Sequence, residues 1–384
     1  MRVLFTSTNG LGHVHPMVPL ARAFAERGDN VLWATGRSAC ERLDRAGLAT
    51  APAGLDEADT MARFARFHAG LGDLPAAQRP DEIFPWLFGE TLPGPMLSDL
   101  LPIARAFEPD LVVSESGEFA GPLLATLRGI PGVTHALGPL VPEARIAAAA
   151  GRLEGLWRAH GQAPLPYGGR YEHCYLDLYP ASLQSQHRPH VRRTQPIRPR
   201  AYATPSDDPL PSGLDGSDLP LVYVTFGTAY NSPGALASVV RAVASRPVRV
   251  IATVGPSTDP GALGAMPGNV QAVGYLPQTE LLPRCAAVVS HGGSGTFLGA
   301  LGAGVPQLLV PQGADQFLNA SACRSSGVGL ALEPSAATPE AVADAVTDLL
   351  AEPRFGGAAR RLQTEIEAMP SADEVAELLA SGLG

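Results

Sequence analysis

Short apolar runs alternate with amphipathic stretches along most of the chain. In the first half, apolar runs start at Arg2, Asn30 and Asp110, and a helical pattern follows each of them. A second alternation of this kind starts at Leu219 and ends in three helical patterns near the C-terminus. Parallel strands are buried on both faces and are therefore apolar throughout, while the connecting helices cover the sheet. The pattern predicts an α/β protein with two such halves.

Residues 288–320 carry the most specific pattern in the second half. A short apolar run enters Ser290-His291-Gly292-Gly293-Ser294-Gly295-Thr296, and a helical pattern follows. A helix N-terminus after a glycine-rich turn presents unpaired backbone N–H groups and a positive dipole end to an anion. The next strand, at residues 307–310, brings Asp315 and Gln316 to the same sheet edge, where they offer partners for hydroxyl groups. We therefore predict a site for a diphosphate and the group attached to it.

A histidine follows the first predicted strand, which spans residues 2–7. His13 lies just behind that strand, and Pro16 suits the first turn of the helix that comes next. The carboxyl edge of a parallel sheet binds ligands and imidazole titrates near neutrality, so His13 is a candidate base for a hydroxyl nucleophile. A single histidine after a strand is otherwise more often structural, and we treat His15 as secondary.

These segments resemble family 1 glycosyltransferases, most of all the bacterial enzymes that attach sugars to antibiotics and other natural products. The resemblance covers residues 2–27 and 222–329, whereas the middle of the chain matches loosely. It implies two Rossmann-like domains that face each other across a cleft (the GT-B fold), each with a parallel sheet flanked by helices. The activity that it implies is inverting transfer of a sugar from a nucleoside diphosphate to an acceptor.

The resemblance also implies roles around His13. Gly12, His13 and Pro16 match a GHxxP pattern in which the histidine deprotonates the acceptor. An imidazole base works better when a carboxylate holds its other nitrogen and stabilises the cation that forms. Glu115 stands where the family usually carries an aspartate, and Glu118, three residues further on, is the alternative partner.

The donor site that the resemblance implies lies in the second half. His291 would donate to a phosphate oxygen and stabilise the charge that develops on the leaving nucleotide. Tyr275 lies where a ring often stacks on the base, although it fits a buried strand-end tyrosine equally well. The predicted donor contacts are Thr228, Tyr275, Leu276, Gln278, His291, Gly293, Ser294, Gly295, Thr296, Asp315 and Gln316, with Asn319 as a weaker candidate. The chain has no apolar strand that ends in a DxD motif, so we predict no metal and no cofactor besides the donor.

An aromatic-rich stretch at residues 54–101 is the predicted acceptor region. Its pattern favours amphipathic helices over an apolar pocket, although each ring could equally serve to pack the domain. The candidate acceptor contacts are Gly12, Phe64, Phe84 and Trp86. We expect the acceptor to be a hydrophobic natural product such as a polyketide.

Composition limits the remaining choices. At 384 residues two domains are expected, and residues 206–217 have linker composition, which predicts domains at 1–205 and 218–384, with the last helix packed back on the first domain. The net charge of −9 argues against nucleic-acid binding, and the absence of lysine leaves anion binding to backbone amides, histidine or arginine. The four cysteines are widely scattered along the chain, which fits reduced thiols better than a disulfide framework or a zinc site. Without an apolar run of about 18 residues or a signal-like start, a cytoplasmic enzyme without a membrane span is expected.

Two other classes of function remain open from the sequence. Gly10-Leu11-Gly12 imitates the start of a dinucleotide-binding fingerprint, but His15 occupies the third glycine position and no acidic residue ends the second strand. The other alternative is a sugar-nucleotide-binding helper without catalysis, against which His13 argues. The lysine-free, alanine- and arginine-rich composition suggests an actinobacterial source. Together with the resemblance to antibiotic glycosyltransferases, it implies a thymidine-diphosphate deoxysugar rather than UDP-glucose as the donor. The identity of sugar and aglycone, the linkage to O, N or C, and the oligomeric state, with a homodimer as one alternative, stay open.

Overall fold

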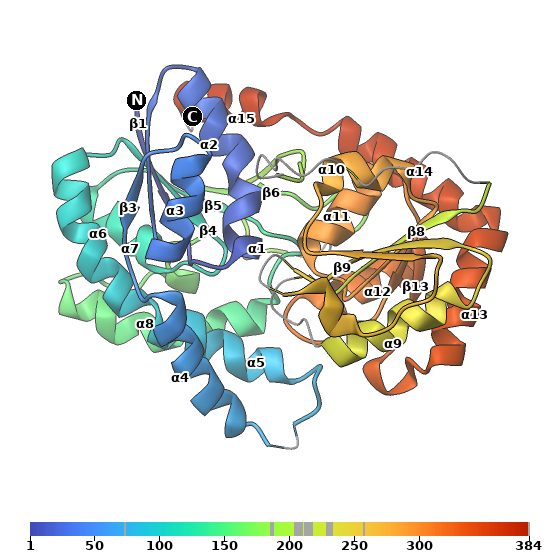
Figure 1. The fold of residues 1–384 in the computed structure, drawn as a ribbon. Coiled ribbons are helices and arrows are strands. Elements are labelled where there is room, and N and C mark those ends of the chain that lie inside the picture. Colours follow the sequence, from blue (N-terminus) through green and yellow to red (C-terminus); the bar gives the residue numbers. More distant parts are fainter. Residues whose placement is uncertain are drawn as a thin grey trace. The chain divides into compact units, whose positions relative to one another are not determined.

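The computed structural model divides the chain into two compact units. It describes residues 1–72, 74–184, 188–202, 210, 218–227, 233–255 and 258–382. Unit 1 comprises Met1–Arg198 with Met369–Gly384, and unit 2 comprises Pro199–Ala368. Both units consist of a parallel sheet with helices on its faces (Figure 1). The predicted α/β architecture with two parallel-sheet domains is therefore confirmed.

In unit 1, the described strands form one seven-stranded sheet in the order β3-β2-β1-β4-β5-β6-β7, with every neighbouring pair parallel. The interior strand β1, between β2 and β4, is buried on both faces, as its apolar sequence requires. The strands are β1 (Arg2–Thr6), β2 (Asn30–Thr35), β3 (Thr50–Pro52), β4 (Leu111–Glu115), β5 (Gly132–His135), β6 (Cys174–Asp177) and β7 (Thr194–Pro196).

Helices connect these strands. The last helix, α15 (Ala372–Ala380), belongs to unit 1, where it packs against α2. Its first turn is closed by a capping box between Ser371 and Glu374. The other helices of this unit are α1 (Leu11–Val14), η1 (His15–Met17), α2 (Val18–Glu26), α3 (Arg37–Arg45), α4 (Glu57–Ala69), α5 (Arg79–Phe84), η2 (Pro85–Thr91), α6 (Pro93–Phe107), α7 (Ala120–Arg128), α8 (Glu143–Ala159) and η3 (Pro166–Gly169).

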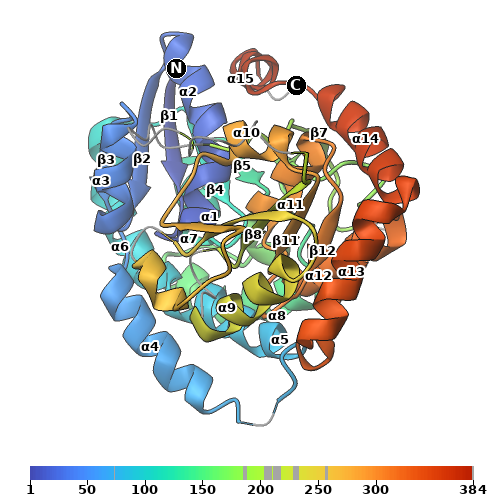
Figure 2. The same cartoon turned by 45° about the vertical axis from the view of Figure 1, so that its right-hand side comes forward.

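Unit 2 contains a six-stranded parallel sheet, in the order β10-β9-β8-β11-β12-β13, within the residues that the structure describes. Helices α9 and α13 pack together over one face and enclose the larger core, while α11 and the turns before β11 cover the other (Figure 2). The strands are β8 (Leu221–Thr225), β9 (Arg249–Thr253), β10 (Val270–Val273), β11 (Ala287–Ser290), β12 (Gln307–Leu309) and β13 (Gly329–Ala331). The helices are α9 (Pro233–Ala244), η4 (Pro260–Leu263), α10 (Gln278–Leu281), η5 (Leu282–Arg284), α11 (Ser294–Gly302), α12 (Gln316–Ser326), η6 (Pro334–Ala336), α13 (Pro339–Ala351) and α14 (Pro353–Glu367).

The structure differs from the sequence-based expectations in three places. The helical segment behind β1 starts at Leu11, before Pro16, and runs through three short pieces. Strands β6 and β7 lie in a region where the sequence predicted no strand, because each has only three or four residues. The boundary between the units falls after Arg198, earlier than predicted. Apart from Leu210, the predicted linker at 206–217 lies outside the described residues, and it stays a prediction.

Candidate functional site

His13 and Glu115 contact each other at the carboxyl edge of the first sheet. Strands β1 and β4 are parallel neighbours, with Thr6 opposite Ser114. The residues that follow Thr6 and Ser114 in the chain therefore lie close together. The Nδ1 atom of His13 lies 2.9 Å from Oε1 of Glu115. The carboxylate is fully buried, whereas the imidazole is 29% exposed. We call these two residues the His13–Glu115 pair.

The surroundings of Glu115 favour its charged form. Its Oε1 atom also accepts a hydrogen bond from the Thr8 hydroxyl at 3.1 Å, and its Oε2 accepts one from the Gly117 N–H. Burial by itself would raise the pKa of the Glu115 carboxyl. The charge and hydrogen bond of His13, the Gly117 N–H and the charge of Arg170 outweigh burial, so this pKa lies below its usual value. A charged Glu115 fixes the tautomer in which Nδ1 carries the proton.

The alternative partner, Glu118, is turned elsewhere. Its carboxylate accepts hydrogen bonds from the Thr6 hydroxyl at 2.6 Å and from the Ala120 and Gly121 N–H groups at 2.6 and 2.8 Å. Burial raises the pKa of Glu118, and the charge of Glu115 adds to this effect. Of the two glutamates left open by the sequence, Glu115 is the one that the structure places on the imidazole.

Aromatic side chains flank the His13–Glu115 pair. The Phe88 ring, on the π-helical turn η2, has its centroid 5.6 Å from that of the His13 ring and 4.8 Å from that of Phe84. A Cβ at Gly117 would lie 2.8 Å from Phe88, so glycine is required for this approach. The sequence pointed to Phe84 but missed Phe88. Periodicity cannot assign faces in a π-turn, because its residues do not follow the α-helical repeat.

The other predicted acceptor residues have their own partners. Trp86 stacks on Phe67, with centroids 4.0 Å apart, and Phe64 lies against His68 at 5.5 Å. Gly12 borders open space, because a Cβ built there meets nothing within 4 Å. Of the predicted acceptor residues, Phe84 is thus linked to His13 through Phe88, and Gly12 is next to His13 in the chain.

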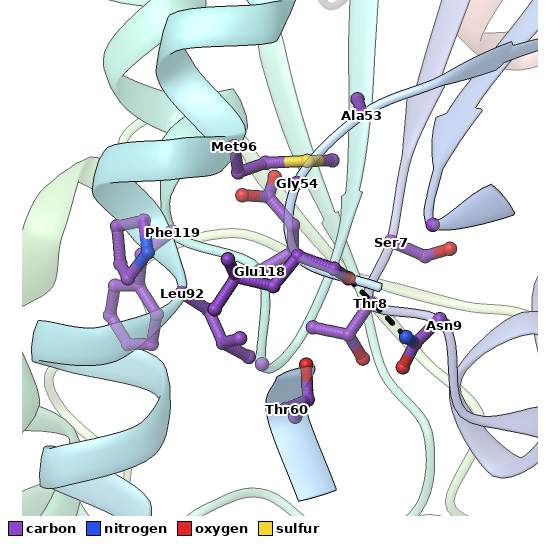
Figure 3. Close-up of a pocket in the computed structure, with 14 residues that line it drawn as sticks. Ser7, Thr8, Asn9, Ala53, Gly54, Thr60, Leu92, Met96, Glu118 and Phe119 are labelled. Carbon is purple, nitrogen blue, oxygen red and sulfur yellow. Dashed lines mark hydrogen bonds between the residues drawn. The ribbon is translucent and has the colours of Figure 1, made fainter. Parts of the chain in front are cut away.

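A small pocket is lined by residues of the segments that follow β1 and β4, among them Thr8 and Glu118 (Figure 3). Thr8 and Gly117, which both donate to Glu115, form part of its wall. Ser7, Asn9 and Thr60 contribute polar groups, while Leu92, Met96 and Phe119 contribute apolar surface. The lining therefore combines apolar side chains with a few groups that can form hydrogen bonds.

The glycine turn at residues 290–293 follows β11 and leads into α11. Gly292 has a φ of +83°, and no side chain caps α11 among the described residues, so the helix N-terminus offers its N–H groups. The His291 ring packs between glycines. A Cβ at Gly227 or Gly293 would lie 2.7 or 2.6 Å from the His291 ring. Burial lowers the pKa of His291 to about 4, so the imidazole is neutral at pH 7.

A buried hydrogen-bond cluster orders this turn. The Asn319 amide donates to the Gly292 carbonyl at 2.8 Å and to the Ser294 hydroxyl at 3.0 Å, and Ser294 in turn donates to Asp315. Asn319 is fully buried, so it holds the turn in place. Ser294 and Asp315, predicted as donor contacts, are brought together by this cluster.

The chain matches known proteins over its whole length. Residues 22–164 match the family described as erythromycin biosynthesis protein CIII-like, N-terminal domain, and residues 237–381 match the corresponding C-terminal domain. The chain is 34% identical to the elloramycin glycosyltransferase ElmGT of Streptomyces olivaceus, over 100% of this chain and 98% of that protein. This chain belongs to the bacterial natural-product family 1 glycosyltransferases. This glycosyltransferase is also 32% identical to the L-demethylnoviosyl transferase of Streptomyces niveus. The match covers 99% of this chain and 98% of that relative.

Solved structures of related enzymes have the same fold. The Streptomyces sp. SF2575 glycosyltransferase SsfS6, complexed with thymidine diphosphate, is 27% identical and superposes with a TM-score of 0.82 over 100% of both chains. The spinosyn rhamnosyltransferase SpnG, complexed with spinosyn aglycone, is 25% identical, with a TM-score of 0.82 over 99% of this chain and 100% of that one. The predicted GT-B fold and glycosyltransferase class are therefore confirmed, in preference to the nicotinamide-dependent alternative.

Two predicted donor residues of the glycosyltransferase have side chains engaged within the protein. The Gln278 amide donates to the Tyr223 hydroxyl at 3.3 Å and to the Thr296 hydroxyl at 3.2 Å. The Gln316 Oε1 accepts from the Gln312 and Gly313 N–H groups at 2.6 and 3.0 Å, so it shapes the loop before α12.

The remaining predicted donor residues fall into three groups. Tyr275 is half-buried and Leu276 is buried. Gly293, Gly295 and Thr296 lie at the start of α11. Thr228 lies outside the described residues.

The described residues also bear on the predictions about a metal and a membrane span. Among the described residues, no group of three or more His, Cys, Asp or Glu could hold a metal ion, and the metal-free mechanism stays a prediction. No helix in the described part of the glycosyltransferase has the length and apolar character needed to cross a membrane.

Proposed function

We propose that this glycosyltransferase moves a deoxysugar from thymidine diphosphate to a hydroxyl of a hydrophobic natural-product aglycone, with inversion at the anomeric carbon. The observation that carries the proposal is the contact of 2.9 Å between His13 Nδ1 and the buried Glu115 carboxylate. Relatives whose names describe transfer of sugars in antibiotic biosynthesis support the substrate class. Related structures with bound thymidine diphosphate support the choice of nucleotide.

In the proposed reaction, His13 is the general base. Because Glu115 holds the proton on Nδ1, Nε2 is the nitrogen that takes the proton of the acceptor hydroxyl. The acceptor oxygen forms a bond to the anomeric carbon as the bond from that carbon to the phosphate oxygen breaks. The electron pair of the broken bond leaves with the nucleoside diphosphate, and the Glu115 carboxylate stabilises the imidazolium.

The glycine turn supplies the anion site in this proposal. A neutral His291 donates one hydrogen bond to a phosphate oxygen, and the N–H groups at the start of α11 add further donors. Charge stabilisation by these groups requires neither a metal nor a cofactor, which is why we propose none.

The acceptor site in this proposal is the aromatic surface around Phe88 together with the pocket lined by Thr8 and Asn9. An apolar ring system packs on the aromatic side chains, and the polar groups orient it. The cytoplasmic location, the absence of a nucleic-acid partner and the homodimer stay predictions from the sequence.

The test is a His13→Ala variant with a His15→Ala variant as its control. A panel of thymidine and uridine diphosphate sugars and polyketide aglycones, followed by mass spectrometry of the products, identifies a working substrate pair. With that pair, His13→Ala should lose transfer by at least about 100-fold, in line with the contribution of a general base. Its affinity for thymidine diphosphate, measured by calorimetry, should stay within about twofold of wild type, since the proposed anion site lies elsewhere.

His15→Ala should retain most of its activity, because His15 lies two residues further along, in η1. Undiminished transfer by His13→Ala would refute the proposed mechanism. So would equal losses of transfer in the two variants.

A further inference from the structure

Arg170 is a buried cation beneath the His13–Glu115 pair. Its side chain is among the largest that are fully buried, with 1% of the residue exposed. None of the ion pairs recorded among the described residues includes Arg170, and its Nε has no hydrogen-bond partner there. A buried guanidinium without an ion pair is costly, so other contacts of Arg170 must offset this cost.

The hydrogen bonds of Arg170 hold the segment that carries Glu115. Its Nη2 donates to the Glu115 carbonyl and its Nη1 to the Glu118 carbonyl, both at 3.3 Å. Between these two carbonyls lies Gly117, whose N–H donates to the Glu115 carboxylate. The guanidinium also lies over the Phe119 ring, 4.3 Å from its centroid. Arg170 thereby forms hydrogen bonds with both ends of the segment at residues 115–118, which we call the 115–118 loop.

The three residues directly before Arg170 have an unusual backbone conformation. Tyr167, Gly168 and Gly169 have φ values of 52°, 66° and 76°, three left-handed residues in succession. A Cβ at Gly168 would lie 3.0 Å from Phe119, and one at Gly169 would lie 3.2 Å from Trp157. The left-handed conformation is unfavourable for a bulky residue such as Tyr167. Strain of this kind persists where the surrounding structure requires it.

We propose that Arg170 is a positioning residue for sugar transfer, which holds the 115–118 loop and places a positive charge beneath Glu115. The Glu115 carboxylate thereby stays charged and aimed at His13 Nδ1. This inference rests on the proposed function of His13 as the base. Arg170 itself touches neither substrate in this scheme, because it is buried under the loop.

Several charged and titratable groups surround the pair and enter any pH dependence. Around Glu115, at the end of β4, lie His13 on α1, Arg170 after η3, Glu118 after β4 and His135 on β5. Arg170 in turn lies near Tyr171 and Tyr175. Removal of the one fixed positive charge in this group raises the pKa of every acid near it, because an imidazolium then meets less repulsion and a carboxylate or phenolate loses attraction. The acid limb of the pH–rate profile should therefore move to higher pH.

The experiment compares three variants by the pH dependence of kcat/KM, with the substrate pair found above. Arg170→Met removes the charge and both hydrogen bonds, so kcat/KM should fall about 10- to 100-fold at pH 7, mainly through kcat, and the acid limb should rise by about one pH unit. Arg170→Lys keeps the charge, but its single ammonium group cannot donate to both carbonyls with the geometry of the guanidinium. It should lose about 3- to 10-fold in kcat/KM with the acid limb unmoved.

Arg188→Met is the matched control. Arg188 forms an ion pair at 2.6 Å with the buried Asp177 in the same unit, so its loss also destabilises the protein. It should lower the melting temperature without moving the acid limb.

The inference is overturned if the acid limb of Arg170→Met stays at its wild-type position, or if Arg188→Met moves it equally. These outcomes are distinct from failure of the proposed function. An active His13→Ala variant refutes the base itself, whereas an inactive His13→Ala variant beside an unshifted Arg170→Met variant refutes only the role of Arg170.

Discussion

The two buried glutamates of unit 1 offer a sharp test, because they lie three residues apart and only one is placed on His13. Glu115→Gln keeps the shape of the side chain but removes the charge that faces the imidazole. Glu118→Gln makes the same chemical change where the carboxylate meets Thr6 and the first turn of α7. Each variant is therefore the control for the other.

The size of the effect follows from the geometry. At the observed 2.9 Å, two unit charges attract by about 6 kcal/mol for an effective dielectric constant of about 20, which is an upper bound. A hydrogen bond to a charged group is worth about 1.5–3 kcal/mol. For Glu115→Gln we take a loss of transition-state stabilisation between these two values, about 3–4 kcal/mol. This loss corresponds to a decrease in kcat of about 10²- to 10³-fold.

Glu118→Gln should behave differently. A neutral amide cannot accept from Ala120, Gly121 and Thr6 at once, so unfolding free energy should fall by about 1–2 kcal/mol, while kcat changes less than about fivefold.

The assay is the initial rate of product formation at saturating donor, with thymidine diphosphate affinity and the melting temperature measured in parallel. Glu115→Gln should lose kcat while it keeps its nucleotide affinity. The reasoning is refuted if Glu118→Gln loses as much kcat as Glu115→Gln, or if Glu115→Gln turns over at the wild-type rate.

Two further predictions concern buried histidines. His291→Ala should weaken thymidine diphosphate binding about 10-fold, because one hydrogen bond to a phosphate is lost, and calorimetry that shows unchanged affinity would count against the anion site. Burial lowers the pKa of the fully buried His135 to about 4, so its neutral ring contributes stability above pH 6.5 that is lost as the pH falls toward 4. Urea unfolding should show a loss of about 2 kcal/mol from this residue between pH 6.5 and 5, and His135→Asn should flatten that dependence; an equally steep curve in the variant would contradict the assignment.

Much of the fold could be predicted because its signals are local. The strand that ends at Ser290, its glycine turn and helix α11 follow one another directly in the chain. The apolar run of β1 similarly marks a buried strand in the interior of the sheet. Short edge strands such as β7 escaped prediction, because three residues carry too little periodicity to be distinguished from a loop.

The sequence by itself determined the architecture, the family and the residue types at the two sites, because these depend on contiguous patterns. Only the tertiary structure decided which glutamate meets His13, since the direction of a side chain at the end of a strand depends on neighbours about a hundred residues away. It likewise revealed Phe88 against the imidazole and Arg170 beneath the 115–118 loop. These contacts join segments that come together only when the sheet forms, and no local pattern of apolar and polar residues records them.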